Sequence, residues 1–471
     1  MAEMDPAGMA LGANPFPITD PELIPAQRYY DEEFYRLECE RLWPHVWQMA
    51  CRLEMIPEVG DWIEYTNVGK SVIVVRTADG VKAYENHCRH RGVPIAGGHG
   101  NDHGNCAKSG FICPFHGWRW NMDGENTFVY GKQLFSEDKL DPKELALKPV
   151  RVETWGGCAF INHDADAPSL RESLGPVTDR LEAHGMGKVR SEWWFGTKLP
   201  ANWKIAMEAF MEGYHVMMTH PQLQRGLPTL YNQRYGDDTG GIGESVNPNM
   251  SVRENITAQI RNMELLNEGM GGMIQAKEIE IARQFAEADL PDDLEQAVPM
   301  WYGMVMGAVS KQLRERGEDV PDLIAVSQSD PVEAVEYLFP HYFLLPSLTS
   351  YSSYRIRPLG PEECFFEIWS LTHYPEGEEP EVPMEPTVLP YDSQDFPMIP
   401  RQDYSNIPIQ QKGLHSDGFE YMRLSKEREG LVSNFQRLID GYIAGVSPEQ
   451  LAKANNELGG NFDGPIKDLG F

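Results

Sequence analysis

Two short segments that combine cysteine with histidine constrain the fold of this 471-residue chain more than any other feature. They read Cys88-Arg89-His90 and Cys113-Pro114-Phe115-His116. A thiolate and an imidazole on one short loop are metal ligands, and two such loops can clamp one metal centre between them. The chain must therefore fold so that these loops meet across the 22 residues that separate His90 from Cys113.

Two kinds of metal centre fit these four residues. The cysteines could bind one iron of an iron–sulfur cluster and the histidines the other, or all four could surround one tetrahedral zinc. Ordinary zinc motifs keep two cysteines in one half and two histidines in the other. Here each half carries one of each, which favours the iron–sulfur cluster.

A second candidate metal site lies between Asn202 and His220. This largely apolar segment contains Glu208, Glu212, His215 and His220. Two imidazoles near buried carboxylates are typical ligands of a divalent metal, and we interpret the segment as an iron site. An amphipathic helix with two ordinary polar histidines is the alternative.

The local geometry of this segment is predicted to be helical at first. Asn202 can cap a helix, and Glu208, Glu212 and His215 recur at spacings of four and three, so they would share one helical face. His215 and His220 are five residues apart, about 140° around an ideal helix. Both can face one ion only if the helix widens or ends between them, and the following Pro221 favours such an end.

Composition narrows the class of protein. A hydrophobic content of 41% predicts a globular chain of two or three domains, and a net charge of -30 argues against nucleic acids, anionic membranes and polyanionic substrates. Seven cysteines, two of them in histidine-containing motifs, indicate a reducing cytoplasm. We see neither a signal peptide nor an apolar run of about 18 residues, and therefore expect a cytoplasmic protein.

Periodicity and turn residues predict the order of the elements. Residues 1–27 form an arm, a short amphipathic helix runs from Asp31 to near Pro44, and a small antiparallel β domain follows. The predicted strands are 61–65, 71–76, 158–162, 350–357 and 364–371. Residues 252–336 are predicted to be helical and rich in methionine, which indicates core packing or a lid over an apolar pocket. A long helix is predicted over 419–444.

Together these motifs resemble a known family. Arg91-Gly92 follows the first Cys/His pair, Gly117-Trp118 follows the second, and Asn202-Trp203-Lys204 opens the E-x-x-H-x4-H segment. The chain resembles the α subunit, the terminal oxygenase component, of Rieske non-haem iron ring-hydroxylating oxygenases. The loop between the two pairs is slightly longer than is usual in the family, and we take His87, His99 and His103 as loop or hydrogen-bonding residues.

The resemblance implies an α+β fold with three parts. An N-terminal arm and helix (1–44) would pack on the catalytic domain, and a small antiparallel Rieske [2Fe-2S] domain would cover 45–165. A helix-grip catalytic domain, a curved antiparallel sheet with long helices, would cover 166–471, with a helical insertion at about 252–336.

The resemblance also implies roles for the site residues. Cys88, His90, Cys113 and His116 would bind the cluster. His215 and His220 would bind iron with a carboxylate that the family places before a Gln-basic-Gly step. This step is Gln411-Lys412-Gly413 here, so we expect Asp403, with Asp392, Asp395 and Asp417 as alternatives. Glu212 would join His215 to His116 of an adjacent subunit, and Glu208, Asn202 and Tyr214 could support the iron site.

The activity implied is O2-dependent mono- or cis-dihydroxylation of an apolar aromatic or polycyclic substrate. Electrons from NAD(P)H would pass through a flavin reductase or ferredoxin to the [2Fe-2S] cluster and then to a mononuclear Fe(II). The implied assembly is a head-to-tail homotrimer (α3), with a β subunit (α3β3) possible. Demethylation of an N- or O-methyl compound, or attack on an alicyclic or steroid-like one, is an alternative; a pure electron carrier is another. An apolar substrate is favoured because the ligands alternate with Phe210, Met211, Val216, Met217 and Met218.

Overall fold

Two large sheets form the frame of the protein. The computed structural model describes residues 14–98, 102–227 and 246–471. The first sheet is antiparallel and has seven strands in the order β2-β11-β10-β5-β4-β3-β6. These strands are Gln48–Arg52, Cys158–Asn162, Pro149–Trp155, Gly80–Glu85, Lys70–Thr77, Asp61–Asn67 and His103–Asn105. The predicted strands at 61–65, 71–76 and 158–162 are confirmed, with β3 and β4 slightly longer than expected.

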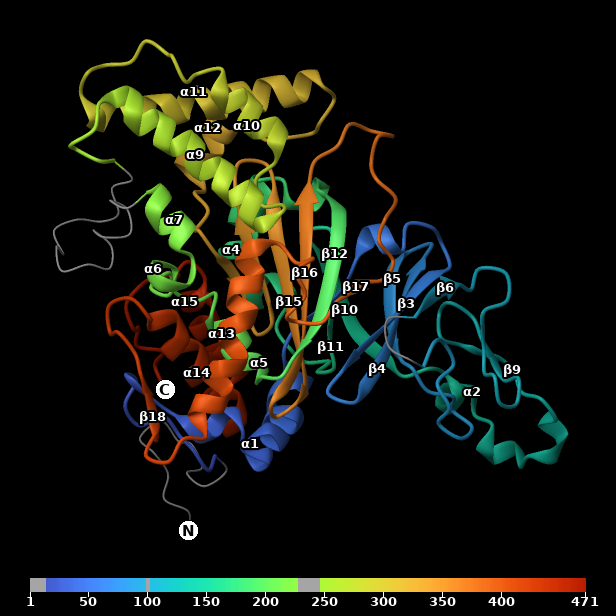
Figure 1. Cartoon of the computed structure of the whole chain (residues 1–471). Helices are drawn as coiled ribbons and strands as arrows, with labels where there is room; N and C mark the ends of the chain where they lie inside the picture. The colour runs from blue at the N-terminus through green and yellow to red at the C-terminus, as the bar shows by residue number, and fades with distance from the viewer. Residues whose placement is uncertain (1–13, 99–101, 228–245) are drawn as a thin grey trace.

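A small three-stranded sheet extends this region away from the rest of the molecule (Figure 1). Its strands are β7 Phe111–Ile112, β8 Arg119–Trp120 and β9 Asn126–Phe128, and the short helix α2 Pro142–Leu145 follows. The second Cys/His segment forms the connection between β7 and β8, and the first follows β5. The loop that precedes Cys113 includes β6, which pairs with β3 and contains His103; His99 lies outside the described residues.

The second sheet has six strands in the order β13-β14-β15-β16-β12-β17. They are Glu336–Leu338, Tyr342–Pro346, Tyr351–Gly360, Glu363–Thr372, Arg190–Leu199 and Thr387–Val388. Neighbours are antiparallel except β12 and β17, which are parallel. The strands predicted at 350–357 and 364–371 are therefore confirmed as β15 and β16.

Alternation along β16 gives the second sheet two buried faces. Phe366 and Ile368 point into one apolar cluster, and Trp369 and Leu371 point into another, as the two-residue period of a strand requires. The cluster around Trp369 is shared with the seven-stranded sheet. Arg355 of β15 spans this boundary, because its guanidinium pairs with Glu367 at 2.7 Å and also donates to the Ala50 carbonyl of β2 at 2.6 Å.

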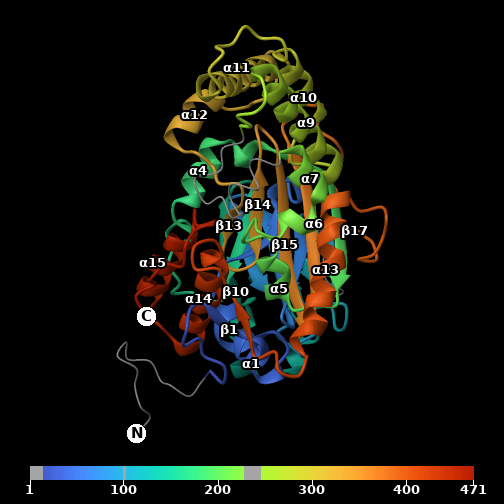
Figure 2. The same ribbon diagram turned by 60° about the vertical axis from the view of Figure 1, so that its left-hand side comes forward.

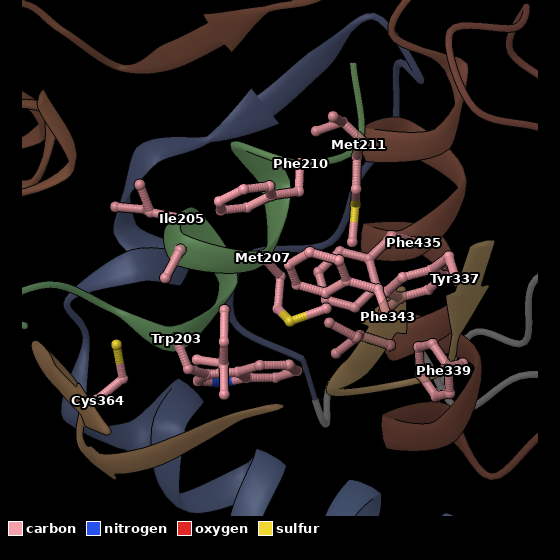
Figure 3. Close-up of a cluster of buried hydrophobic side chains, with 14 of the residues drawn as sticks. Trp203, Ile205, Met207, Phe210, Met211, Tyr337, Phe339, Phe343, Cys364 and Phe435 are labelled. Atoms are coloured by element: carbon pink, nitrogen blue, oxygen red, sulfur yellow. The ribbon is translucent and has the colours of Figure 1, made fainter. Parts of the chain in front are cut away.

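Helices cover the other face of the second sheet (Figures 1 and 2). These are α5 Trp203–Glu208, α13 Met398–Leu414 and α14 Gly430–Ala444, joined by α1 Glu32–Leu37 and followed by α15 Pro448–Leu458. Figure 3 shows their shared core, in which Trp203, Met207 and Phe435 from the helices lie beside Phe343 of the sheet.

Segments near the beginning and near the end of the described chain contact each other in this layer. Asp31 caps α1 by accepting from the Phe34 N–H, and a π-helical turn, Glu38–Leu42, continues the helix to a short 3-10 turn, Trp43–His45. Strand β1, Leu23–Pro25, pairs with β18, Tyr421–Arg423. The predicted helix over 419–444 is therefore wrong in its first part, since residues 421–423 satisfy their backbone by strand pairing and the helix begins only at Gly430.

Residues 252–336 are mainly helical, as predicted, and form a separate layer above the edge of the second sheet (Figure 1). The helices are α9 Val252–Met270, α10 Ala276–Arg283, α11 Leu294–Glu315 and α12 Leu323–Ser329. Their apolar residues make a cluster of their own. Gly269 of α9 allows close packing on α13, because a β-carbon there would lie 2.6 Å from Ile399. Within the described parts of the chain, no helix is long and apolar enough to cross a membrane.

Candidate metal centres

The two Cys/His loops have the same backbone geometry. In each loop the cysteine N–H donates to the carbonyl five residues later, at 2.8 Å for both Cys88 and Cys113. The glycine four residues after the cysteine donates back to the cysteine carbonyl, at 2.9 Å from Gly92 and 3.0 Å from Gly117. Both glycines have left-handed φ angles, 79° and 69°, which favour glycine. A cysteine followed four residues later by a glycine therefore forms the same kind of tight loop at both places in the chain.

These loops place thiols and imidazoles in different surroundings. Cys88 and Cys113 are 3% and 2% exposed, whereas His90 and His116 are partly exposed. Burial and the adjacent Cys113 thiol raise the pKa of Cys88. The Nδ1 atoms of His90 and His116 lie 3.2 Å apart, and the His90 ring stacks on Trp118 at 4.8 Å between centroids. Two buried sulfurs thus face inward and two neighbouring imidazoles face the surface.

This arrangement suits a two-iron cluster better than one zinc ion. A tetrahedral zinc has bonds of about 2.0–2.3 Å, so its ligand atoms all lie within about 4 Å of one another. In the described part of the chain, three ligand atoms within 4.8 Å of one another are found at His215, His220 and Asp403, and not among the four Cys/His residues. The four Cys/His ligands are more widely spread, as expected when two cysteines serve one iron and two histidines the other.

The segment that carries the second centre is not one helix. Asn202 caps α5 by accepting from the Lys204 N–H, but α5 ends at Glu208. The expectation that Glu208, Glu212 and His215 share a helical face is therefore wrong. The backbone re-forms only as one turn, α6 Val216–Thr219, and then as α7 Pro221–Gly226.

The break in the helix allows His215 and His220 to face the same point although they are five residues apart. His215 precedes α6, and His220 lies between α6 and α7 with φ −119° and ψ 62°, outside the helical region. Their rings lie 5.3 Å apart between centroids. As expected for a residue before proline, His220 leaves the α region and its ring can turn toward that of His215.

Asp403 of α13 meets both rings. Its Oδ1 lies 3.1 Å from His220 Nε2 and 3.9 Å from His215 Nε2. The Asp403 side chain is buried, and its Oδ2 has no hydrogen-bond partner in the described parts of the chain. The alternative carboxylates Asp392 and Asp395 are exposed, as is Asp417.

The outer nitrogen of each imidazole has an acceptor. His215 Nδ1 lies 2.9 Å from Glu212 Oε1, and the other oxygen of Glu212 accepts the His215 backbone N–H at 2.9 Å. His220 Nδ1 lies 2.8 Å from Gln402 Oε1, which also accepts from Gln222 at 2.9 Å. We therefore assign both Nδ1 atoms as donors, which leaves each Nε2 with a lone pair directed toward Asp403.

The acceptor atoms of His215, His220 and Asp403 that face one another would be stabilised by a cation between them. Nε2 of a neutral His220 and a carboxylate oxygen are both acceptors, and at 3.1 Å they repel unless a proton or a metal ion lies between them. Burial opposes a charge on His215, but Glu212 and Asp403 outweigh it and raise the pKa of His215 to about 9. Two imidazoles and one carboxylate with open positions beside them form the ligand set of non-haem Fe(II) oxygenases, and the residues fit such an ion.

Gln402 was not assigned a role from the sequence. The only available signal was its position directly before Asp403 on the expected carboxylate helix. Which side chain would reach His220 Nδ1 could not be deduced, because α13 and the His220 segment are separated by more than 170 residues.

The other candidate residues lie in different contacts. Glu208, the last residue of α5, accepts hydrogen bonds from Tyr29, at 2.9 Å, and from Gln436 of α14. Asn202 donates to the Pro361 carbonyl at 2.6 Å, and Tyr214 is 57% exposed.

The apolar residues interleaved with the ligands do not form one surface. Phe210 and Met211 belong to the buried core (Figure 3), and Met218 is 86% exposed. These side chains point in different directions and therefore do not line one substrate pocket.

The two candidate centres lie on opposite sides of the six-stranded sheet. In Figures 1 and 2 the seven-stranded sheet and the Cys/His loops lie on one side, and α6, α7 and α13 lie on the other. Within a single chain the sheet therefore separates the cluster loops from the His215 site.

Known proteins share both regions of the chain. Residues 46–129 match the model of the Rieske [2Fe-2S] domain, and residues 179–445 match the model of the ring hydroxylating alpha subunit (catalytic domain). The carnitine monooxygenase oxygenase subunit of Escherichia coli (strain K12) is 29% identical over 204 residues, 42% of this chain and 52% of that protein. The chlorobenzene dioxygenase subunit alpha of Cupriavidus sp. (strain PS12) is 34% identical over 210 residues, 43% of this chain and 44% of that protein. The aligned part thus spans about half the length of these relatives.

Solved structures share the fold over nearly the whole chain. Naphthalene 1,2-dioxygenase with indole bound has a TM-score of 0.62 at 19% identity, covering 97% of each chain. A quaternary ammonium Rieske monooxygenase in complex with L-carnitine has a TM-score of 0.58 at 16% identity, covering 94% of this chain and 99% of that one. Since the catalytic-domain match alone covers more than half of the residues, the chain belongs to the ring hydroxylating alpha subunit family, with a Rieske [2Fe-2S] domain preceding its catalytic domain.

Proposed function

We propose that this chain is the terminal oxygenase component of a Rieske system, which uses O2 to hydroxylate a small apolar substrate, aromatic or polycyclic. The observation that carries the proposal is the convergence of His215 and His220 on a buried carboxylate of Asp403 that lacks a hydrogen-bond partner in the described chain. When bound, the cluster would supply single electrons and the mononuclear iron would activate O2.

The protein's own residues would keep both sites ready. Cys88, His90, Cys113 and His116 would hold the cluster. Glu212 and Gln402 would fix the two imidazoles with their Nε2 atoms toward the iron, so that little reorganisation accompanies metal binding.

A ring of at least three copies would bring the two kinds of site together. Because the sheet lies between them in one chain, electron transfer would need a short route between neighbours. We propose a head-to-tail homotrimer in which Glu212 of one copy accepts from His116 of the next while it orients His215. A β subunit is compatible with this ring. Both relatives are named as subunits of larger enzymes, which supports a separate reductase or ferredoxin partner for this chain.

A second candidate activity is oxidation of a quaternary ammonium compound. It is favoured by the relatives that act on carnitine and glycine betaine and by the choline monooxygenase of Spinacia oleracea, 32% identical over 218 residues. Chlorobenzene dioxygenase, with higher identity over a similar length, favours the aromatic class.

One experiment separates these activities. The purified chain is reconstituted with excess Fe(II) and sulfide, for which we expect about three irons and two acid-labile sulfides per chain. It is then supplied with a surrogate reductase, NADH and O2. Naphthalene, biphenyl, choline and carnitine are then offered in parallel, and products are identified by mass spectrometry. We expect hydroxylated aromatic products, and none from Asp403→Ala. Formaldehyde or an aldehyde from the ammonium compounds alone would establish the second candidate, and two irons per chain without turnover would indicate an electron carrier.

A further inference from the structure

Helix α9 of the helical insertion packs on two helices that carry or adjoin iron ligands. It contacts α7, which begins directly after His220, and α13, which carries Asp403. Figures 1 and 2 show α9 lying over α7 and the start of α13. Leu223 of α7, Met270 of α9 and Ile399 of α13 belong to one buried apolar cluster. The insertion therefore reaches the region of the iron ligands through the packing of helices.

One face of α9 makes both contacts. Leu265 and Gly269 are four residues apart and share a face of the helix. A β-carbon added at Gly226, the last residue of α7, would lie 2.9 Å from the Cδ1 atom of Leu265. One added at Gly269 would lie 2.6 Å and 2.8 Å from the Cδ1 and Cγ1 atoms of Ile399. Each helix thus meets α9 at a glycine, where there is no room for another carbon atom.

The end of α9 is fixed to the six-stranded sheet. The indole of Trp193 in β12 donates to the Gly271 carbonyl at 2.9 Å. A β-carbon at Gly272 would lie 2.5 Å from the Ser370 hydroxyl oxygen of β16, and Gln275 donates to that oxygen at 3.2 Å. Because a packed interior transmits strain, an atom added between α9 and α13 should displace α13.

The contact at Ile399 lies one turn before the iron ligand of α13. Ile399, Gln402 and Asp403 are spaced by three and four residues, so they are neighbours on one side of the helix. Gln402 exchanges amide hydrogen bonds of 2.9 Å and 3.2 Å with Gln222 of α7 and also accepts from His220. A movement of α13 at Ile399 is therefore carried to Asp403 and, through the Gln402 amide, to His220.

We propose that Gly269 is a positioning residue of the iron site. Its lack of a side chain lets the insertion hold α13 at the distance that brings Asp403 to His215 and His220. The helical insertion thereby supports the geometry of ligands that come from separate segments of the chain. This inference rests on the proposed function only in that these three ligands bind a metal ion.

The test is Gly269→Ala. The added carbon would lie 2.6 Å from Ile399 Cδ1, whereas ordinary contact is about 3.5–4.0 Å, so the two groups must separate by about 1 Å. The Cγ1 atom cannot turn away freely, because isoleucine is stiff at χ1. Metal–ligand distances tolerate only about 0.2 Å. We expect the affinity for Fe(II) to fall about tenfold or more and turnover to fall about 100-fold.

Iron affinity is measured by equilibrium dialysis of the full chain against a graded Fe(II) chelator. The Rieske absorption of the same sample reports on the cluster and should not change. The EPR spectrum of Co(II) bound in place of Fe(II) is a second readout, because it depends on ligand geometry while the oxidised cluster is EPR-silent. We expect Gly269→Ala to alter the Co(II) spectrum.

Two other glycines provide matched controls. Gly413 is the penultimate residue of α13, as Gly269 is of α9, and Gly303 lies within α11. A β-carbon at either position would meet no other part of the described chain within 4 Å. Gly413→Ala and Gly303→Ala should keep the iron affinity of the wild type, since alanine favours a helix more than glycine does.

A second substitution should relieve the clash. Ile399→Ala removes both atoms that the added carbon would meet, and the remaining Cβ would lie 3.9 Å away. Gly269→Ala/Ile399→Ala should therefore bind Fe(II) at least as tightly as Ile399→Ala alone. If Gly269→Ala does not fold, Ile399→Ala tests the same contact, because loosening it should also weaken iron binding.

Wild-type iron affinity in Gly269→Ala would overturn the inference, as would equal losses in the two control variants or unchanged affinity in Ile399→Ala. A loss in the double variant as large as that in Gly269→Ala would do the same. Failure of the wild type to bind a mononuclear Fe(II) would overturn the proposed function and this inference with it. Tight binding by both the wild type and Gly269→Ala would overturn the inference alone.

Discussion

Gln402 provides a sharp test of the proposed iron site, because it touches an iron ligand without binding iron itself. Its Oε1 accepts from His220 Nδ1 at 2.8 Å, and His220 is 3% exposed. Gln402→Leu keeps a similar size and removes this acceptor. The His220 N–H would be left unpaired in a buried site, at a cost of about 1–3 kcal/mol.

Part of that cost would appear as weaker metal binding. Loss of a partner that orients a ligating histidine typically lowers metal affinity about 10–100-fold, which corresponds to about 1.4–2.7 kcal/mol. The two ranges overlap, so we expect the dissociation constant of the mononuclear iron to rise by that factor. The cluster ligands lie on the far side of the sheet and should be unaffected.

The assay is equilibrium dialysis against a graded Fe(II) chelator, with the Rieske absorption of the same sample as an internal control. Gln402→Glu retains an acceptor and should bind iron at least as well as the wild type. Gln410→Leu, the same substitution at an exposed position of α13, should have no effect. Wild-type iron affinity in Gln402→Leu would refute the role of the amide, and an equal loss in Gln410→Leu would point to damage to α13 instead.

Three further predictions concern carboxylates and cluster ligands. Glu212→Gln replaces an acceptor oxygen by a donor amide, so turnover should collapse while iron and sulfide contents stay unchanged; normal turnover would argue against the bridge between subunits. His116→Cys replaces a neutral ligand by an anionic one and should lower the cluster's midpoint potential, whereas an unchanged midpoint would remove His116 from the ligand set. Burial outweighs the hydrogen bonds from Gln436 and Tyr29 and raises the pKa of Glu208 from 4.5 to about 7. Between these two values the folded state holds a proton that the unfolded state releases, so the free energy of unfolding should fall by about 3 kcal/mol as the pH rises from 4.5 to 7. Urea titrations at several pH values should show that the free energy of unfolding falls more steeply with pH in the wild type than in Glu208→Gln. An equal dependence on pH in the two proteins would show that Glu208 does not titrate between pH 4.5 and 7.

Much of the cluster site is determined by local sequence. Cysteine, histidine and a glycine at the fourth position after the cysteine form a self-contained loop, since both hydrogen bonds that shape it join residues at most five apart. Strands β3, β4 and β11 of the seven-stranded sheet were equally predictable, because runs of β-branched and aromatic residues between turn signals express a local preference. For the same reason the helical character of residues 252–336 followed from periodicity.

Errors arose where long-range contacts compete with local preference. The segment from Glu208 to His220 has helical spacing, yet its backbone leaves the helix after Glu208 and resumes for one turn. Residues 421–423 join a helical pattern in the sequence but pair with β1, almost 400 residues earlier. In neither segment can these long-range contacts be seen in the short stretch of sequence over which periodicity is counted.

Sequence by itself determined the kinds of ligand and the local shape of the loops that carry them. The tertiary structure decided which of many carboxylates meets His215 and His220, and which amide orients His220. It also put the two metal sites on opposite faces of a sheet. These features depend on distances between side chains far apart in the chain, which are set by the packing of sheets and helices and not by the spacing of residues.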